Sequence, residues 1–485
     1  MLSQLPNLNL ISLYPLLVVT TTAVLVLLAD LFVVNKRALG YLALAGVVTA
    51  FVVMVSLWPG AAASFQSMAV SDGFALAFDM VFLVTAALAL LVAMDYLAAK
   101  DLQRGEYYAL LLFAVAGMMA TAAAQDLIIV YLGLETMSIS LYVLTGFNRR
   151  EVTSVEAAMK YFVLGAFASA FLLYGVALTY GAAGSTNLAR IGAWLAVNGI
   201  PGDPVALAAL ALLLVGFGFK VALVPFQWWT PDVYQGAPTS VTMFMAVGAK
   251  AAGFAALMRL LYTAFSPAFT ADWVTVVAVL AALTMTAGNL AALVQKDVKR
   301  MLGYSSIAHA GYILVGVAAG GGDGQRGVVF YLLAYTFMTA GAFAVACAVE
   351  RRDQTSTTLS DYAGLVQRAP LLAAAMTLFM VSLIGIPPLM GFWGKLFVFR
   401  AAVESNLTWL AIVGVVNSAI AAFYYLGVVV QMIMREPAQS PAAEPLAATA
   451  VRRRVAMGTA IALAAVATLL IGIWPSVITG LVRGL

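Results

Sequence analysis

Four ionisable residues of this sequence interrupt long apolar stretches. Glu135 lies in "IIVYLGLETMSISLYVL", Lys220 in "LLLVGFGFKVALVPF", Lys250 in "VTMFMAVGAKAAGFAALM" and Lys395 in "GFWGKLFVF". Amine and carboxyl groups can bind and release protons, but a charge at the centre of a lipid bilayer costs about 2.5–3.5 kcal/mol. Four such groups without partners would cost on the order of 10 kcal/mol, comparable with the net stability of a domain. We therefore expect all four side chains to face the protein interior, where they could handle protons.

The numbers of amines and carboxylates among these residues bear on their role. A purely structural interpretation is a set of buried ion pairs that fixes the register of the helices. However, one carboxylate cannot neutralise three ammonium groups, and burial disfavours the charged form of lysine. At least one of the three lysines is therefore predicted to lose and regain a proton near neutral pH, as a proton carrier must.

Prolines lie close to two of the lysines. Pro225 follows Lys220, while Pro387 and Pro388 precede Lys395. A proline within a helix removes one hydrogen-bond donor and frees a carbonyl of the preceding turn. Backbone groups freed inside a membrane are tolerated only where protein buries them or a wet cavity receives them, and transporters handle ions beside such breaks. The sequence thus predicts two broken helices with an ion-handling lysine at each. The carbonyls expected to be freed are those of Val221, Leu383 and Ile384.

Further polar residues could complete a line between the charges. His309 lies in "YSSIAHAGYIL", between the Lys250 and Lys395 helices in chain order, where a relay would need a bridge. A satisfied core histidine is the alternative. Tyr424 is predicted to pack in the core, with a hydroxyl that could join the line. Lys160 and Arg259 lie toward the ends of their apolar runs, where long side chains can reach the membrane surface.

Membrane helices are the elements that must position these residues. The chain has 485 residues, of which 64% are hydrophobic and 9% are charged, whereas soluble proteins carry about 25% charged residues. Because a spanning helix needs about 20 apolar residues, the apolar runs predict an all-α polytopic membrane protein with about fourteen transmembrane helices.

The predicted helices divide into successive groups along the chain. We expect N-terminal helices over 1–104, one repeat over 105–262 and a second over 273–434, each with one broken helix. A polar cytoplasmic loop is expected over 435–453 and a last helix over 454–485. Because an odd number of helices is expected in each repeat, the two repeats would be inverted relative to one another in the membrane.

Lysine and arginine are distributed unevenly among the predicted loops. The positive-inside rule places the richer set of loops in the cytoplasm and, with an even number of helices, puts both termini on the periplasmic side. This bias explains the net charge of +4, and we expect the lipid bilayer and no nucleic acid as a partner. The richer set includes Lys100, Arg149, Arg150, Lys296, Lys299 and Arg300, and the poorer set holds Arg190, Arg326, Arg400 and Arg483.

The residue inventory excludes several kinds of chemistry within this chain. Cys347 is the only cysteine and His309 the only histidine, so iron–sulfur clusters, structural zinc and bis-histidine haem would lack ligands. The sequence contains no P-loop and no dinucleotide fingerprint. We therefore predict that this chain binds no metal or redox cofactor, and that it either transports ions or supports partners that do the chemistry.

Five stretches carry a resemblance to a known family. They occur in the family's order and cover most of the chain between residues 105 and 400: "LGLETMSISLYVLTGF", "EAAMKYFVLGAFASAFLLYG", "VPFQWWTPDVYQGAPTSVTMF", "QKDVKRMLGYSSIAHAGYIL" and "GIPPLMGFWGKLFVF". The chain resembles subunit N of the proton-translocating NADH–quinone oxidoreductases (respiratory complex I), one of the antiporter-like subunits. That family also includes subunits L and M and the Mrp-type cation/proton antiporters. Lysine at position 395 and the chain length resemble subunit N more than M or L.

The resemblance implies a role for individual residues. Glu135, Lys220, Lys250 and Lys395 match the charged residues of the family's fifth, seventh, eighth and twelfth helices. His309 and Lys160 match polar positions on the same axis. Gln227 departs from the pattern, because relatives usually have histidine there and glutamine cannot titrate.

The resemblance also implies partners and a location. It implies a bacterial inner membrane and other membrane and peripheral subunits of complex I, including antiporter-like paralogues. NADH, FMN, iron–sulfur clusters and quinone would be bound by those partner subunits and not by this chain.

We predict that the chain moves protons along a mid-membrane line of Glu, Lys and water, coupled to quinone reduction in partner subunits. Protons would reach Lys220 or Lys250 from the cytoplasm, pass His309 and leave beyond Lys395. Three alternatives stay open: an Mrp-type sodium/proton antiporter subunit, a non-conducting membrane scaffold, and a quinone-binding subunit. Sodium-dependent transport would favour the first, and tolerance of apolar residues at all four charges would favour the second.

Overall fold

The structure is a computed structural model that describes residues 10–58, 60, 62–65, 67–198, 203–265, 269–350, 357–436 and 455–481. Apart from its first two residues, the polar loop expected over 435–453 lies outside this part of the chain, as does Arg483.

Within the described residues, 13 helices are long and apolar enough to cross a membrane. A shorter pair of helices, α16 (Pro370–Ile384) and α17 (Met390–Glu404), follows α14 in the chain. With this pair counted as one interrupted span, the all-α fold with about fourteen transmembrane segments is confirmed. The 13 helices are α1 (Tyr14–Asp30, preceded by η2, Ile11–Leu13), α2 (Lys36–Ser56), α3 (Gly73–Ala99), α4 (Gly105–Ala123), α5 (Leu127–Thr145), α6 (Val152–Ala183), α8 (Pro204–Val221), the continuous run of α10 (Thr239–Phe244), η3 (Met245–Ala249), α11 (Lys250–Arg259) and η4 (Leu260–Ala264), then α12 (Thr270–Leu293), α13 (Val298–Ala319), α14 (Gly321–Val349), α18 (Thr408–Met434) and α20 (Val455–Ile473).

Short elements connect the spans. An antiparallel hairpin of β1 (Ala62–Ser64) and β2 (Ala69–Ser71), with Ala63 opposite Val70, lies between α2 and α3. The short helices are α7 (Leu188–Asn198), α9 (Trp229–Gly236), η5 (Leu359–Tyr362), α15 (Leu365–Arg368) and α21 (Ser476–Leu481).

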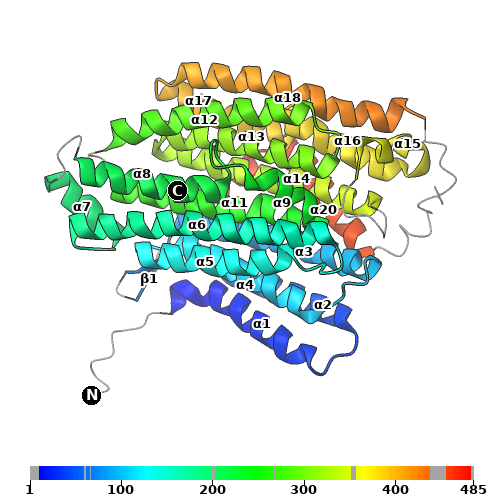
Figure 1. Cartoon of the computed structure of the whole chain (residues 1–485), viewed down its shortest axis with the longest axis horizontal. Coiled ribbons are helices and arrows are strands. Elements are labelled where there is room, and N and C mark those ends of the chain that lie inside the picture. Colours follow the sequence, from blue (N-terminus) through cyan, green and yellow to red (C-terminus); the bar gives the residue numbers. More distant parts are fainter. Residues whose placement is uncertain are drawn as a thin grey trace.

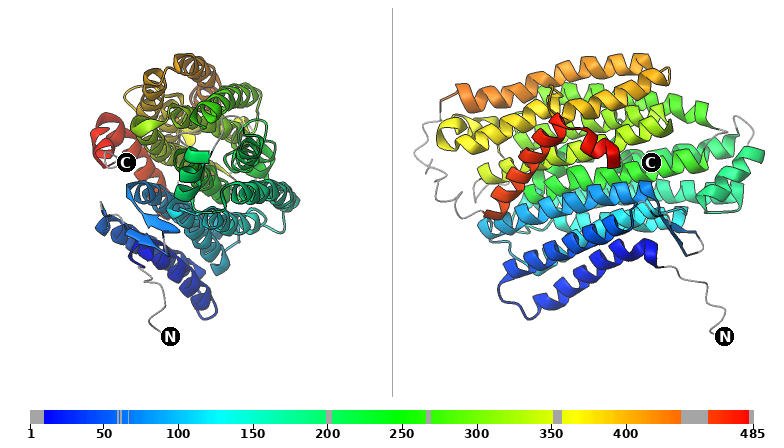
Figure 2. Two further views of the ribbon diagram at one scale, coloured as in Figure 1. Left: turned by 90° about the vertical axis from the view of Figure 1, so that its left-hand side faces the viewer. Right: turned by 180° about the vertical axis from the view of Figure 1, so that it is seen from behind.

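The long helices run side by side in one bundle (Figure 1). Helices α1 and α2 form one edge of the bundle and α18 lies at the opposite edge, and the end-on view shows α20 at the outer side of the bundle (Figure 2). Helix α20 packs on α14, α3 and α17 and crosses the bundle obliquely.

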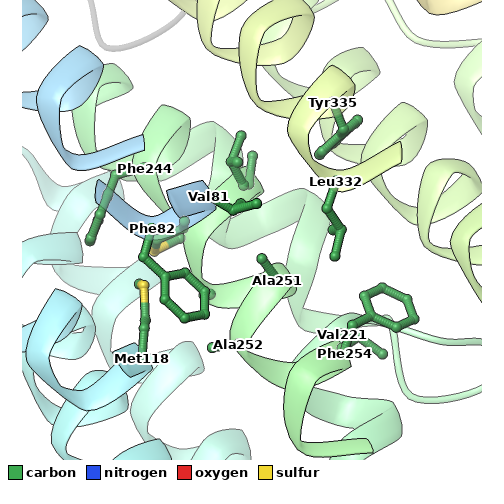
Figure 3. Packing of buried hydrophobic residues seen from close by; sticks show 14 of the residues in the cluster. Val81, Phe82, Met118, Val221, Phe244, Ala251, Ala252, Phe254, Leu332 and Tyr335 are labelled. Atoms are coloured by element: carbon green, nitrogen blue, oxygen red, sulfur yellow. The ribbon is translucent and has the colours of Figure 1, made fainter. Parts of the chain in front are cut away.

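The run from α10 to α11 is the buried centre of the bundle. Every residue from Thr239 to Arg259 is buried. Figure 3 shows Ala251 and Ala252 of this run surrounded by apolar side chains of other helices, among them Phe82. Small residues let helices approach closely inside a membrane; a Cβ atom at Gly253 would lie 2.5 Å from Val221 of α8. Charges on this run are therefore far from lipid.

Both predicted helix breaks are present. Helix α8 ends at Val221, Ala222 has a positive φ of 61°, and regular helix resumes at α9. Helix α16 ends at Ile384, Gly385 has a φ of 93°, and α17 begins at Met390. A left-handed residue ends a helix, and the prolines that follow cannot supply the N–H groups needed to continue it.

Candidate functional site

Glu135 and Lys220 form an ion pair between α5 and α8. The Nζ atom of Lys220, in the last turn of α8, lies 3.4 Å from Oε1 of Glu135 and donates to the hydroxyl of Ser138 at 2.7 Å. Glu135 also accepts a 2.5 Å hydrogen bond from Ser169 of α6. The lysine side chain is 2% exposed and the glutamate 21%. The carboxylate thus lies nearer the outside of the bundle than the amine that it faces.

Lys250 lies at the end of a π-helical turn. The turn η3 ends at Ala249, and π-turns widen a helix and often mark functional sites. Lys250 donates to the hydroxyl of Ser306 in α13 at 2.6 Å and also to the carbonyl of the same residue. No carboxylate pairs with Lys250 within the described chain. The prediction that ion pairing cannot satisfy all the lysines therefore applies to Lys250.

His309 bridges two further helices through tyrosines. Its Nδ1 lies 2.8 Å from the hydroxyl of Tyr331 in α14, and its Nε2 lies 3.1 Å from that of Tyr425 in α18. Tyr425 is also hydrogen-bonded to Ser305, one residue before the partner of Lys250. His309 is 1% exposed and fully hydrogen-bonded, which satisfies the core-histidine alternative and also gives the histidine a connection toward Lys250.

Lys395 lies beside the second break. Its Nζ atom donates to the carbonyl of Ile384 at 2.8 Å and to the hydroxyl of Ser418 in α18 at 3.1 Å, and it lies 4.5 Å from the ring centre of Tyr312. Ile384 is one of the residues whose carbonyl the prolines were expected to free. At this break the freed backbone acceptor thus binds the lysine. At the first break, Nε1 of Trp229 donates to the carbonyl of Phe219 at 3.1 Å.

The structure gathers these residues into small clusters of direct contacts. Glu135 and Lys220 are in contact, Lys250 is joined to α13 through Ser306, and both His309 and Lys395 lie close to the ring of Tyr312. Lys220 and Lys250 have no direct hydrogen bond, and neither do His309 and Lys395. The side chains therefore form separate clusters rather than a continuous chain of direct contacts.

Tyr424 is both packed and hydrogen-bonded. Its hydroxyl donates to Oδ1 of Asn289 in α12 at 3.0 Å, and its ring lies 4.3 Å from that of Tyr425. The hydroxyl that faces His309 belongs to Tyr425.

Lys160 lies apart from these clusters. It is half-exposed and forms 2.8 Å ion pairs with Glu156 and with Asp232 of α9, which also binds Arg300 at 2.7 Å. Burial of Asp232 favours its neutral form, but the hydrogen bonds from Lys160 and Arg300 outweigh this effect and hold the pKa of the carboxyl below its ordinary value. A cavity of about 230 Å³ adjoins Lys160 and Asp232. Lys160 was predicted as a possible relay residue on the same axis as the other lysines. Its ion pairs to Glu156 and Asp232 do not join it to the clusters around those lysines.

Arg259 lies inside the bundle, where it binds a carboxylate at the start of α3. Arg259 is 7% exposed, and its guanidinium donates two 2.6 Å hydrogen bonds to Asp72, the residue that caps α3. The same group lies 4.4 Å from the ring centre of Phe74. The sequence argument considered only the depth of Arg259 and missed a carboxylate on another helix.

Other polar residues near the lysines were not predicted as partners. Ser138, Ser306 and Ser418 each bind one of the lysines. Serine is common in membrane helices, where its hydroxyl usually returns to its own backbone, so these residues gave no separate signal in the sequence.

Two carboxylates inside the bundle were also missed. Glu350 pairs with Lys100 at 2.7 Å and accepts a hydrogen bond from Tyr96. Asp79 of α3 is 8% exposed, and its Oδ1 has no hydrogen-bond partner in the described chain. Asp79 interrupts the apolar run "GFALAFDMVFLV", so searching for acids as carefully as for lysines would have found it.

Gln227 lies between the first break and α9. Its side-chain oxygen is buried and has no hydrogen-bond partner among the described residues. Nothing in its contacts connects it to Lys220.

Sequence comparisons assign residues 124–421 to a family described as "NADH:quinone oxidoreductase/Mrp antiporter, TM". A protein of Chloroflexus aggregans named "NADH-quinone oxidoreductase subunit N" is 48% identical over 486 residues, which cover 99% of this chain and 97% of the relative. A protein of the same name from Trichlorobacter lovleyi is 49% identical over 436 residues, 90% of this chain and 89% of the relative.

Solved structures agree with these matches. A chain of "Respiratory complex I from Thermus thermophilus with bound Aureothin" superposes with a TM-score of 0.78 at 36% identity, over 97% of this chain and 99% of that one. A chain of an archaeal membrane-bound sulfane sulfur reductase has a TM-score of 0.84 at 26% identity, over 98% and 97% of the two chains. A chain of the Mrp complex from Dietzia shares the fold, with a TM-score of 0.82 at 24% identity.

Proposed function

Because the chain belongs to the subunit N family of NADH-quinone oxidoreductases, within the NADH:quinone oxidoreductase/Mrp antiporter membrane proteins, we propose that it is a proton-translocating subunit of such an enzyme. Quinone reduction takes place in partner subunits, and this chain moves protons across the membrane. The observation that carries this proposal is the set of three buried lysines, Lys220, Lys250 and Lys395, of which only Lys220 has a carboxylate partner among the described residues.

Protons cross the middle of the membrane by way of the three lysines. Water joins the separate clusters, since a proton moves only along hydrogen bonds and the side chains alone leave gaps. A proton from the cytoplasm reaches Lys220 or Lys250, passes the region of His309 and leaves beyond Lys395. Each lysine must release a proton as well as bind one, and a desolvated amine without a carboxylate partner does so most readily.

Glu135 controls how firmly Lys220 holds its proton. Opposite charges about 4 Å apart attract by about 4 kcal/mol at an effective dielectric constant of about 20, and doubling the separation removes about half of that attraction. Such a change alters the proton-binding equilibrium more than tenfold, since about 1.4 kcal/mol is a factor of ten. The break after Val221 allows α8 and its last-turn lysine to shift, and the half-buried carboxylate lies where a neighbouring subunit could move it.

The two breaks divide the chain into related halves. In this proposal residues 105–262 and 273–434 are two inverted repeats, flanked by N-terminal helices over 1–104 and by a last helix over 454–485. The two breaks share a local pattern that supports this division. Each helix ends at a left-handed residue, Ala222 or Gly385, and a proline follows within three residues. The subunit spans a bacterial inner membrane with both termini on the periplasmic side. NADH, FMN, iron–sulfur clusters and quinone are bound by the partner subunits of complex I.

The proposal is tested by replacing the ion pair in the intact complex. Glu135→Ala and Lys220→Ala complexes are reconstituted into vesicles, and proton uptake and quinone reduction are measured per assembled complex. Arg190→Ala serves as a control, because Arg190 is an exposed cation of α7. Both site variants should assemble and lose most of their pumping and coupled quinone reduction. Full activity in both would support the scaffold alternative and contradict proton transfer through this pair.

A further inference from the structure

A buried pair of amides lies beside the Lys395 cluster. Asn289 of α12 and Asn417 of α18 are 0% and 3% exposed. Nδ2 of Asn289 donates to Oδ1 of Asn417 at 3.3 Å and to the hydroxyl of Tyr312 at 3.2 Å, and its Oδ1 accepts from Tyr424 at 3.0 Å. Nδ2 of Asn417 donates to the carbonyl of Val413 at 3.0 Å. The same Nδ2 atom also donates to the hydroxyl of Thr286, one turn before Asn289 in α12, at 3.1 Å. Both amides thus use all of their donors.

The direction of each hydrogen bond in this network is determined by the backbone. A carbonyl can only accept, so the amide that faces Val413 must be the NH₂ end of Asn417. The oxygen of Asn417 then faces Asn289 and requires the NH₂ end of that residue. The second hydrogen of this NH₂ group is directed at Tyr312, and the remaining oxygen must receive the hydrogen of Tyr424. One backbone carbonyl therefore makes Tyr312 an acceptor and Tyr424 a donor.

Tyr312 lies beside Lys395, and Tyr424 lies beside the tyrosine that faces His309. The Tyr312 ring lies 4.5 Å from the amine of Lys395. The Tyr424 ring lies 4.3 Å from that of Tyr425, whose hydroxyl is 3.1 Å from His309. The amide pair is thus connected to both clusters.

Ser418 completes the connection on the lysine side. Its hydroxyl accepts from Lys395 at 3.1 Å, and its single hydrogen has two acceptors within reach, the carbonyl of Gly414 at 3.0 Å and the hydroxyl of Tyr312 at 3.4 Å. Because Tyr312 already receives a hydrogen from Asn289, the orientation of its hydroxyl relative to Ser418 depends on the amide pair.

We propose that the Asn289–Asn417 pair is a positioning element for proton transfer between the His309 and Lys395 clusters. It holds the hydroxyl of Tyr312 as an acceptor from Asn289 and that of Tyr424 as a donor to Asn289, and so sets the resting orientation of both hydroxyls before a proton passes. This inference rests on the proposed function, because a positioning role has meaning only if protons pass between these clusters.

A structural role would account for part of the same geometry. Amides often join helices inside membranes, and a pair that only joined α12 to α18 would affect how much complex assembles. It would leave the pumping rate of each assembled complex unchanged. A positioning role affects that rate, together with its solvent isotope effect, because misdirected hydroxyls slow the proton-transfer step itself.

The test replaces Asn289 in the intact complex. Asn289→Leu keeps the branched shape of the side chain and removes its hydrogen bonds, and Asn289→Ser is a smaller second variant for the case that the larger leucine prevents assembly. Thr275→Val is the control, because Thr275 is an exposed residue of the same helix that bonds only to its own backbone. Proton uptake per assembled complex is measured in vesicles made with H₂O and with D₂O.

We expect the Asn289 variant that assembles to pump at least about fivefold more slowly, the factor corresponding to one lost hydrogen bond, with a larger solvent isotope effect than the control. A normal rate and isotope effect would overturn the inference. Lys395→Met is measured in parallel. If it abolishes pumping while Asn289 variants pump normally, only the positioning role fails; if Lys395→Met also pumps normally, the proposed function itself fails.

Discussion

Lys395 donates a 2.8 Å hydrogen bond to the carbonyl of Ile384, the residue at which α16 ends. The break in the helix therefore supplies a ligand for the amine, and the amine satisfies a backbone group that the missing N–H donors leave open. A neutral amine can keep this interaction as a donor, so the bond survives release of a proton. The same pair of groups can thus hold Lys395 in place in both protonation states.

Replacing Gly385 should disturb this pair. Gly385 has a φ of 93°, and a Cβ atom there would lie 3.0 Å from Cδ of Lys395. Gly385→Ala adds backbone strain of about 1–2 kcal/mol and pushes the lysine from the Ile384 carbonyl. We expect a severalfold loss of pumping per assembled complex, measured by proton uptake. The matched control is Gly427→Ala in α18, where a Cβ atom meets nothing within 4 Å. Equal activity of the two variants would contradict this prediction.

Ser138→Ala should weaken the first cluster without removing a charge. The Nζ atom of Lys220 lies closer to the hydroxyl of Ser138, at 2.7 Å, than to Oε1 of Glu135, at 3.4 Å. Loss of one hydrogen bond to a charged group corresponds to about 1.5–3 kcal/mol. We expect slower pumping than in the wild type and faster pumping than in Lys220→Ala, with normal assembly. Proton uptake rates of the three complexes, measured side by side, check this order.

Lys160 should contribute less to pumping than Lys250. Lys160 is half-exposed and paired with two carboxylates, whereas Lys250 is 2% exposed and bound to Ser306. Exposed ion pairs contribute little, typically about 0–1 kcal/mol. We therefore expect Lys160→Met to retain most of the pumping rate and Lys250→Met to lose most of it. A loss with Lys160→Met as large as with Lys250→Met would place Lys160 on the proton path.

The Asp72–Arg259 pair predicts a pH-dependent contribution to stability. Burial of Asp72 favours its neutral form, but the two hydrogen bonds from Arg259 outweigh burial and hold the pKa of the carboxyl below its ordinary value. Such a group stabilises the folded state above its unfolded pKa of about 3.9 and loses that contribution as the pH falls through the folded pKa. Asp72→Asn should lower the Tm of the detergent-solubilised complex at pH 7. The difference in Tm between the Asp72→Asn complex and the wild-type complex should narrow below about pH 4. A difference that grows on acidification would contradict this assignment.

The sequence was sufficient to predict the parts of the site that follow from charge and from proline. The cost of a charge in lipid predicts that Lys220, Lys250 and Lys395 are buried, and all three are. The proline rule predicts a free carbonyl at Ile384, and this carbonyl binds Lys395. These arguments use only local sequence and the properties of the bilayer.

The partners that depend on helix rotation could not be predicted. Ser306 of α13 binds Lys250, which follows a π-turn and lies 56 residues earlier in the chain. Asp72 belongs to the N-terminal helices and binds Arg259, 187 residues further along the chain, and no periodicity in the sequence connects them. Depth in the membrane alone was a poor guide for Arg259, since it says nothing about which helix faces the side chain.

The most direct test of proton carriage is replacement of Lys395 by arginine in the assembled complex. Arginine keeps the positive charge and hydrogen-bond donors, but its guanidinium does not deprotonate in proteins. If Lys395 carries protons, Lys395→Arg should pump as poorly as Lys395→Met, measured as proton uptake per assembled complex in vesicles. If the residue is needed only as a fixed charge, Lys395→Arg should pump at the wild-type rate, and that result would contradict proton transfer through the lysine.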